Sequence, residues 1–146
     1  MAGSIIASFK ALLLAQMQAA GSLNGIQITY GDPGEAMRRE SIFLGDVDSG
    51  TQTPESFSTG ARRRVEDFTV DVILAVQSKP TPQTAEARAL VLVNAVEQIL
   101  VDSPQLGGSI AALQFCEVEG MSMTTNQADQ PNCVCTIRIH AKARLA

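Results

Sequence analysis

The sequence predicts an α+β fold in which a mostly antiparallel sheet carries two amphipathic helices packed on one face. Segments 4–20 and 81–102 repeat apolar residues at helical spacing, whereas 64–77 and 133–145 alternate apolar and polar residues as strands do. Hairpin connections favour antiparallel neighbours, and the apolar face of the sheet needs both helices as its cover. The 146 residues are expected to form a single domain, 1–146.

The first half of the chain is expected to form one helix and two short strands. Ser4 is a candidate N-cap for a helix that ends near Ala20. Short strands are expected at 26–30 and 41–47, with a Gly-Asp-Pro-Gly turn after the first. The polar stretch 48–63 has no hydrophobic period and predicts a long loop, and a connection of that length is usually functional or disordered.

The second half begins with the clearest strand, 64–77. Its apolar face is expected to consist of Phe68, Val70, Val72, Leu74 and Val76. Thr81 is an N-cap candidate with Pro82 at the first helical position of a helix that ends near Asp102. The buried stripe of that helix is expected to be Ala85, Ala89, Leu92, Val93, Val96 and Leu100.

Two further strands are expected to close the domain. The first runs from Ile110 to about Met123, with Leu113 and Phe115 on one face, and a polar connection follows it. The second, 133–145, alternates almost without interruption. Its polar face is expected to consist of Val134, Thr136, Arg138, His140, Lys142 and Arg144.

The composition argues against several classes of partner. Aromatic residues make up only 4% of the chain, which leaves few platforms for stacking bases or sugars. The net charge is −4, whereas nucleic-acid binders usually carry a basic excess, so no sequence-specific nucleic-acid binding is expected. No apolar run approaches the roughly 20 residues that span a bilayer, so no membrane partner is expected. Three cysteines are an odd number, which suits a reducing cytoplasm.

The sequence does not place the residues required for catalysis beside the histidine, or those required for zinc binding beside the cysteines. His140 is the only histidine and lies between Arg138 and Lys142, which would repel a developing imidazolium, and the sequence identifies no orienting partner. Cys133 and Cys135 form a C-x-C pair without the second pair that a zinc site requires. Both alternate in phase with apolar residues, which favours buried core thiols. We therefore expect no catalytic residue, no metal and no cofactor.

Two charged groups leave alternatives open. Asp67 and Asp71 share one face of a strand and can serve as an acid–base pair or a metal site. They can equally oppose the cations of the last strand, which is the interpretation that we favour. The run Arg62-Arg63-Arg64 can hold phosphate or carboxylates, or it can be a solvated entrance to a strand.

The polar strand faces and the long loop favour a protein interface over a ligand site. Phe57 is the only aromatic residue of the loop and can anchor in a partner's groove, and we expect the segment to be ordered only at such a contact. The residues assigned to an interface by this hypothesis are Phe57, Arg62, Arg63, Arg64, Arg138, His140, Lys142 and Arg144.

The layout of the chain resembles the tail terminator, or tail completion, proteins of long-tailed bacteriophages. The resemblance spans nearly the full length and depends on the order of parts, not on a catalytic motif. After an N-terminal helix, it is carried by Ile26-Gln-Ile-Thr-Tyr30-Gly31-Asp-Pro33, Glu40-Ser-Ile-Phe-Leu-Gly45, a Ser/Thr/Gly loop, Arg64-Val-Glu66-Asp-Phe68-Thr-Val70-Asp-Val72, Thr84-Ala85-Glu86-Ala87-Arg88 and two closing strands.

The resemblance implies a structural virion protein. Such a protein assembles as a ring, typically a hexamer, on the last ring of the tail tube, where it ends tube growth and joins the tail to the head. The implied partners are further copies of the chain, the tail tube protein and a head–tail connector or neck protein, and DNA can pass through the ring. The implied location is the head-proximal end of the virion tail, after assembly in the host cytoplasm.

Three alternatives remain beside this interpretation. Another head–tail neck or connector protein would share the same layout. A small-molecule-binding α+β module would need apolar walls with converging polar groups, whereas the polar groups here spread along whole strands. An enzyme of unrecognised type would have to use Asp67, Asp71 and His140.

Overall fold

The computed structural model describes residues 3–54, 64–77, 79–126 and 132–145, which form one sheet flanked by helices. The strand order is β1-β2-β3-β5-β4. β1 runs parallel to β2 and every other neighbouring pair is antiparallel, which confirms the predicted α+β class. The strands are β1 (Gln27–Thr29), β2 (Glu40–Pro54), β3 (Arg64–Val76), β4 (Leu113–Asn126) and β5 (Asn132–Leu145).

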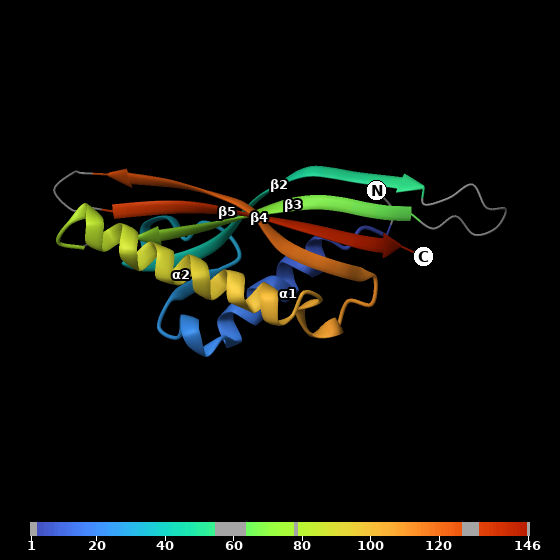
Figure 1. Cartoon of the computed structure of the whole chain (residues 1–146), viewed down its shortest axis with the longest axis horizontal. Coiled ribbons are helices and arrows are strands. Elements are labelled where there is room, and N and C mark those ends of the chain that lie inside the picture. Colours follow the sequence, from blue (N-terminus) through green and yellow to red (C-terminus); the bar gives the residue numbers. More distant parts are fainter. Residues whose placement is uncertain (1–2, 55–63, 78, 127–131, 146) are drawn as a thin grey trace.

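Both α-helices lie on the same face of the twisted sheet, as predicted (Figure 1). They are α1 (Ile6–Ala19) and α2 (Pro82–Asp102). Short 3₁₀ turns, η1 (Gly21–Leu23), η2 (Gly34–Ala36) and η3 (Leu106–Gly108), follow α1, β1 and α2 respectively. We call the helix side the covered face and the opposite side the outer face.

α1 is capped by a residue that is distant in sequence. Ile5, not Ser4, occupies the N-cap position, although the Ser4 hydroxyl accepts a hydrogen bond from Ile6 N–H at 3.3 Å. The Ile5 N–H donates to Oε1 of Glu66 in β3 at 2.9 Å. A carboxylate at this position satisfies a free N–H and complements the helix dipole. On the buried side of α1, Phe9 meets Phe68 edge to face, with ring centroids 5.3 Å apart.

α2 follows its sequence prediction closely. The Thr81 hydroxyl accepts from Thr84 N–H at 3.2 Å, and the helix then begins at Pro82. All six residues of the predicted stripe are buried. Arg88 donates from both Nε (2.5 Å) and a terminal nitrogen (3.1 Å) to Glu40, which ties α2 to the start of β2. The hydrogen bond from Arg88 holds the pKa of Glu40 below its ordinary value.

The predicted loop at 48–63 begins later than expected. β2 continues to Pro54, and Asp48, Thr51 and Thr53 face residues of β3 across the ladder. Their side chains are exposed, so backbone pairing rather than apolar burial forms this part of the strand. A strand with exposed polar side chains has no hydrophobic periodicity, so the sequence pattern does not predict it. Residues 55–63 lie outside the described residues.

Bulges in β2 and β4 change which side chains face outward. In β4 the register shifts between Leu113 and Phe115, and again between Val118 and Gly120. Leu113 therefore faces the helices, whereas Phe115 lies opposite Lys142 on the outer face. The prediction that Leu113 and Phe115 share a face is wrong for this reason. The strand also begins and ends three residues later than predicted, at Leu113 and Asn126.

The three thiols belong to the core on the covered face. Cys116, Cys133 and Cys135 are all buried, and the two sulfurs of the C-x-C pair lie 4.0 Å apart. Burial raises the pKa of both Cys116 and Cys135 to about 12. The interpretation of Cys133 and Cys135 as core thiols is confirmed.

Candidate functional site

The outer face of the sheet collects the charged residues that the sequence singled out. β5 lies between β3 and β4, so its polar side chains meet a partner strand on each side. The cross-strand pairs are Asp71 with Arg138, Asp67 with Lys142, and Glu117 with His140. The favoured interpretation of Asp67 and Asp71, that they oppose cations of the last strand, is confirmed.

His140 is held between two carboxylates. Its Nε2 forms a short hydrogen bond with Oδ1 of Asp67, and its Nδ1 lies 3.7 Å from Oε1 of Glu117. The Phe115 ring stands edge-on to the imidazole, with centroids 5.7 Å apart. The expectation that His140 has no orienting partner is therefore wrong. Asp67 comes from β3, and bulged β4 supplies Glu117 and Phe115, which sequence spacing could not place.

The described side-chain contacts of His140 are two carboxylates and an aromatic ring. The hydroxyl nearest in register belongs to Thr69, which lies opposite His140 but donates to the Asp48 carbonyl at 2.9 Å. Nucleophilic catalysis needs an activated hydroxyl or thiol beside the base. An electrostatic role in the sheet accounts for the contacts that are present.

Asp71 shows how tightly the outer face is packed beside β2. Its Oδ1 is buried and has no hydrogen-bond partner among the described residues, and Arg138 Nε lies 3.9 Å away. Gly45 of β2 comes so close that an added Cβ would lie 3.0 Å from Ile73 Cδ1 and 3.3 Å from Asp71 Cβ. Only glycine fits at this contact without displacing a neighbour.

The structure separates the residues of the predicted interface. Arg138, His140, Lys142 and Arg144 share the outer face of β5. Arg64 is exposed at the start of β3, but it lies opposite Leu145, in phase with the covered face. Phe57, Arg62 and Arg63 lie outside the described residues, as does most of the segment that we expect to be ordered only at a contact.

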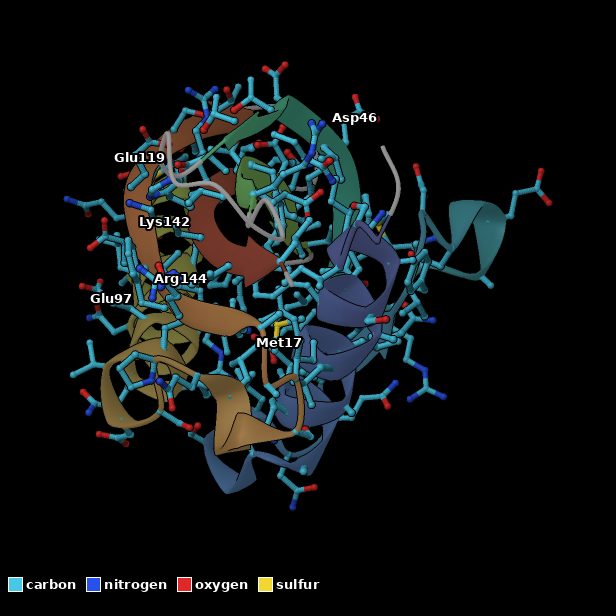
Figure 2. The ribbon with its side chains drawn as sticks, turned by 90° about the vertical axis from the view of Figure 1, so that its right-hand side faces the viewer. Met17, Asp46, Glu97, Glu119, Lys142 and Arg144 are labelled. Atoms are coloured by element: carbon cyan, nitrogen blue, oxygen red, sulfur yellow. The ribbon has the colours of Figure 1, made fainter. Side chains whose placement is uncertain are left out.

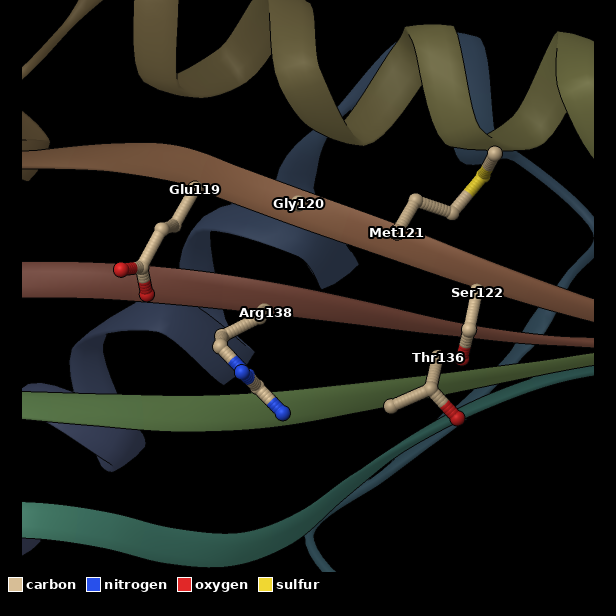
Figure 3. A pocket seen from close by; sticks show the side chains of 6 residues that line it. All are labelled: Glu119, Gly120, Met121, Ser122, Thr136 and Arg138. Atoms are coloured by element: carbon tan, nitrogen blue, oxygen red, sulfur yellow. The ribbon is translucent and has the colours of Figure 1, made fainter.

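A shallow hollow of about 340 Å³ opens beside the second bulge of β4. Figure 3 shows Arg138 and Thr136 of β5 beneath Glu119 and Ser122 of β4, while Met121 points toward α2. Its described lining includes one guanidinium and one carboxylate, and Met121 is the one large apolar side chain in that lining. The described residues therefore do not form the enclosing apolar walls of most small-molecule sites.

A second groove, of about 420 Å³, lies between the C-terminal half of α2 and β4. Its described lining includes the apolar residues Leu100 and Val118, and the charged residues of this described lining are Glu97 and Glu117. Val101 on its rim is 62% exposed and extends the apolar surface of the groove toward solvent. The sequence alone does not reveal this groove, because the groove depends on how α2 crosses β4.

The described residues include no group of three or more histidine, cysteine, aspartate or glutamate side chains arranged to hold a metal ion. No helix in the described part of the chain is long and apolar enough to cross a membrane.

Comparisons with known proteins show the fold alone. No protein-family model matches the sequence, and no curated protein matches it. Among solved structures, the chain is similar to a chain from the virion of a native gene transfer agent (GTA) particle, with a TM-score of 0.59 and 17% sequence identity. The alignment covers 98% of this chain and 99% of the other, so the similarity includes the whole architecture.

Proposed function

We propose that the protein is a structural component of a phage-type virion, and that it forms a ring at the head-proximal end of the tail. The observation that carries the proposal is the match over the whole of both chains to a protein of a gene transfer agent virion. The sequence resemblance to tail terminator proteins refines it: the ring ends growth of the tail tube and offers the surface to which the head joins. The role is non-catalytic.

The charged outer face supports this proposal. Its cations are interleaved with carboxylates from both neighbouring strands, an arrangement that suits contact with another protein surface better than continuous contact with a phosphate backbone. The proposed partners are further copies of the chain, the tail tube protein and a connector or neck protein. DNA passing through the ring would need no specific contact.

Deletion of the gene from the genome that encodes it tests the proposal. We expect particles without the protein to show tails of irregular, excessive length and unattached heads, because nothing ends the tube or bridges it to the head. Negative-stain images supply the measurement, and expression of the chain in trans is the control that restores normal tails. Joined particles with tails of uniform length in the deletion would overturn the proposal.

A head–tail neck protein of the same fold is the second candidate. The whole-chain match to a virion protein serves it equally well. The same images separate the two candidates. Loss of a neck protein leaves tails of normal length without heads, whereas loss of a terminator leaves long ones.

A further inference from the structure

We propose that the groove between α2 and β4 receives the corner around Arg38 and Arg39 of a second copy of the chain, in a head-to-tail contact. The inference rests on the proposed ring, and it names the two surfaces that close it. Two observations support the inference: the groove and the arginine corner lie at opposite edges of the sheet, and their charged residues have opposite signs.

The receiving surface is the edge of the sheet at β4, where the charged residues of the described groove lining are both carboxylates, and we call it the acidic edge. β4 is the last strand of the sheet on this side, and among the described residues it pairs only with β5. The groove beside it has an apolar floor, and its carboxylates are Glu97 of α2 and Glu117 of β4. Lys142 and Arg144 project from the same side, between Glu97 and Glu119 in Figure 2, but neither lines the groove.

Side-chain docking suits this edge better than strand addition. Two bulges interrupt β4, one after Leu113 and one after Val118, so its outer backbone groups do not form an unbroken ladder. Bulges of this kind protect edge strands from continuous pairing with another chain. The exposed Val101 and the groove floor offer apolar contact instead, and the carboxylates select a cationic partner.

The inserted surface lies at the opposite edge. β1 is the last strand there, and Figure 2 shows the η2 turn that follows it projecting away from the side of Glu97 and Glu119. Arg38 and Arg39 come directly after this turn and are exposed. Neither guanidinium has an ion pair within the described part of the chain.

The backbone of this corner is fixed while its arginine side chains are free. Arg38 N–H donates to the Gln27 side chain at 2.8 Å, and the Arg39 carbonyl accepts from Gln77 N–H at 2.7 Å. Asp32 accepts from Gly34 N–H at 2.8 Å, and among the described residues neither Asp32 nor Glu35 forms an ion pair with Arg38 or Arg39. A rigid backbone that presents two unpaired arginines is well suited to an interface.

The two surfaces are different and lie at opposite edges, so a contact between them is heterologous. Such a contact leaves a free surface at each end of a dimer, and repetition produces either a closed ring or a filament. A contact between two copies of the same edge would instead stop at a dimer. The proposed contact is therefore of the type that a ring requires.

Cross-linking with a flexible bis-maleimide tests the geometry. The variant carrying both Val101→Cys and Ala36→Cys, which keeps both arginines, is treated as concentrated purified protein and in purified particles. We expect a ladder of covalent oligomers that ends at the ring size. The wild-type chain is the matched control, since its three cysteines are buried and should not be linked.

Two results would overturn the contact. One is the absence of a ladder from both samples. The other is a covalent dimer from the Val101→Cys single variant, because such a dimer would require two acidic edges to meet. Overlong tails in the gene deletion together with no ladder would leave the proposed function standing and remove this interface. A ladder together with normal tails in the deletion would support this interface and overturn the proposed function.

A charge swap tests the chemistry independently. Glu97→Arg, or Arg38→Glu with Arg39→Glu, should each weaken self-association on the order of ten-fold, and combining all three should restore most of it. Gln98→Arg adds a cation to the adjacent face of α2 and should have no such effect. Equal association by all variants, with unchanged thermal melting, would contradict the proposed pairing of charges.

Discussion

The covered face and the outer face of the sheet share β3 and β5 but are stabilised by different interactions. On the covered face, side chains from the strands pack against α1 and α2, and Phe68, Leu74 and Ile139 are almost completely buried. On the outer face, the same strands present alternating acids and cations that are only partly shielded from water. Burial of apolar surface therefore supplies most of the stability, and the outer face is free to serve contacts with other proteins.

Each face also contains an exception. Glu66 is buried on the covered face, where it accepts hydrogen bonds from Ile5 N–H and from Gln52 Nε2 at 3.1 Å. On the outer face, Phe43 is only 7% exposed, near the start of β2. The difference in burial between the two faces is thus clear in the part of the sheet that contains His140 and smaller in the part near Phe43.

The largest expected difference between the faces is in thiol reactivity. Burial raises the pKa of Cys116 from 9.0 to about 12, so this thiol is far less ionised at mildly alkaline pH than an exposed thiol. Thr136→Cys would place a thiol on the outer face. Maleimide labelling of the native variant at mildly alkaline pH should modify the introduced thiol alone, and rapid labelling of all thiols would show that the covered face opens readily.

Truncation of two phenylalanines sharpens the comparison in free energy. Phe68→Ala should lower the free energy of unfolding by about 3–5 kcal/mol, because it empties a fully buried site against Phe9. Phe115→Ala should cost only about 1 kcal/mol, since that ring is half-buried on the outer face. Denaturant unfolding of both variants measures the difference, and equal losses would mean that the outer face is part of the core.

The buried carboxylate of Glu66 is expected to matter through the helix end that it caps. Glu66→Ala should cost about 1–3 kcal/mol, because Ile5 N–H then lacks its acceptor in a buried place. Glu66→Gln retains one oxygen that can accept from Ile5 and should cost less. Hydrogen exchange at Ile5 and in the first turn of α1 should be faster in the alanine variant. Unchanged exchange there would show that Glu66 does not anchor the helix.

The smallest effect is expected at the ion pair between Glu40 and Arg88. Arg88 lowers the pKa of Glu40, so the pair stabilises the fold fully above the ordinary value of 4.5 and loses this contribution as the pH falls through the lowered pKa. Arg88→Gln should cost about 0.2–1 kcal/mol at neutral pH and progressively less in acid. Lys79→Gln is the weaker control, with its Nζ 3.6 Å from Glu40. A loss that does not change with pH would contradict the assignment.

Much of the covered face could be predicted from the sequence. Residues 133–145 alternate with few interruptions, and the stripe of α2 repeats at helical spacing, so periodicity alone predicted their buried sides. Glu66 was also within reach, because it lies two residues before Phe68 and therefore in phase with the apolar face. Its burial was not predicted, because a carboxylate without a charged partner is rarely found in a hydrophobic core.

The outer face was much less predictable, because its contacts depend on register. The spacing of Asp67, Asp71 and His140 suggested opposition between strands, but no sequence signal gave the bulges that bring Glu117 and Phe115 to His140. The strand at 48–54 was missed because it is held by backbone pairing and its side chains are polar. The groove at Glu97 depends on the crossing of α2 over β4, which involves distant parts of the chain.

The central claim, a ring at the head-proximal end of the tail, is tested most directly by locating the protein in purified particles. Gold labelling of a C-terminal tag, imaged by electron microscopy, gives the position, and untagged particles give the background. The account predicts label at a single level, where the tail meets the head. Label along the whole tail or on the capsid, or its absence from intact particles, would contradict the claim.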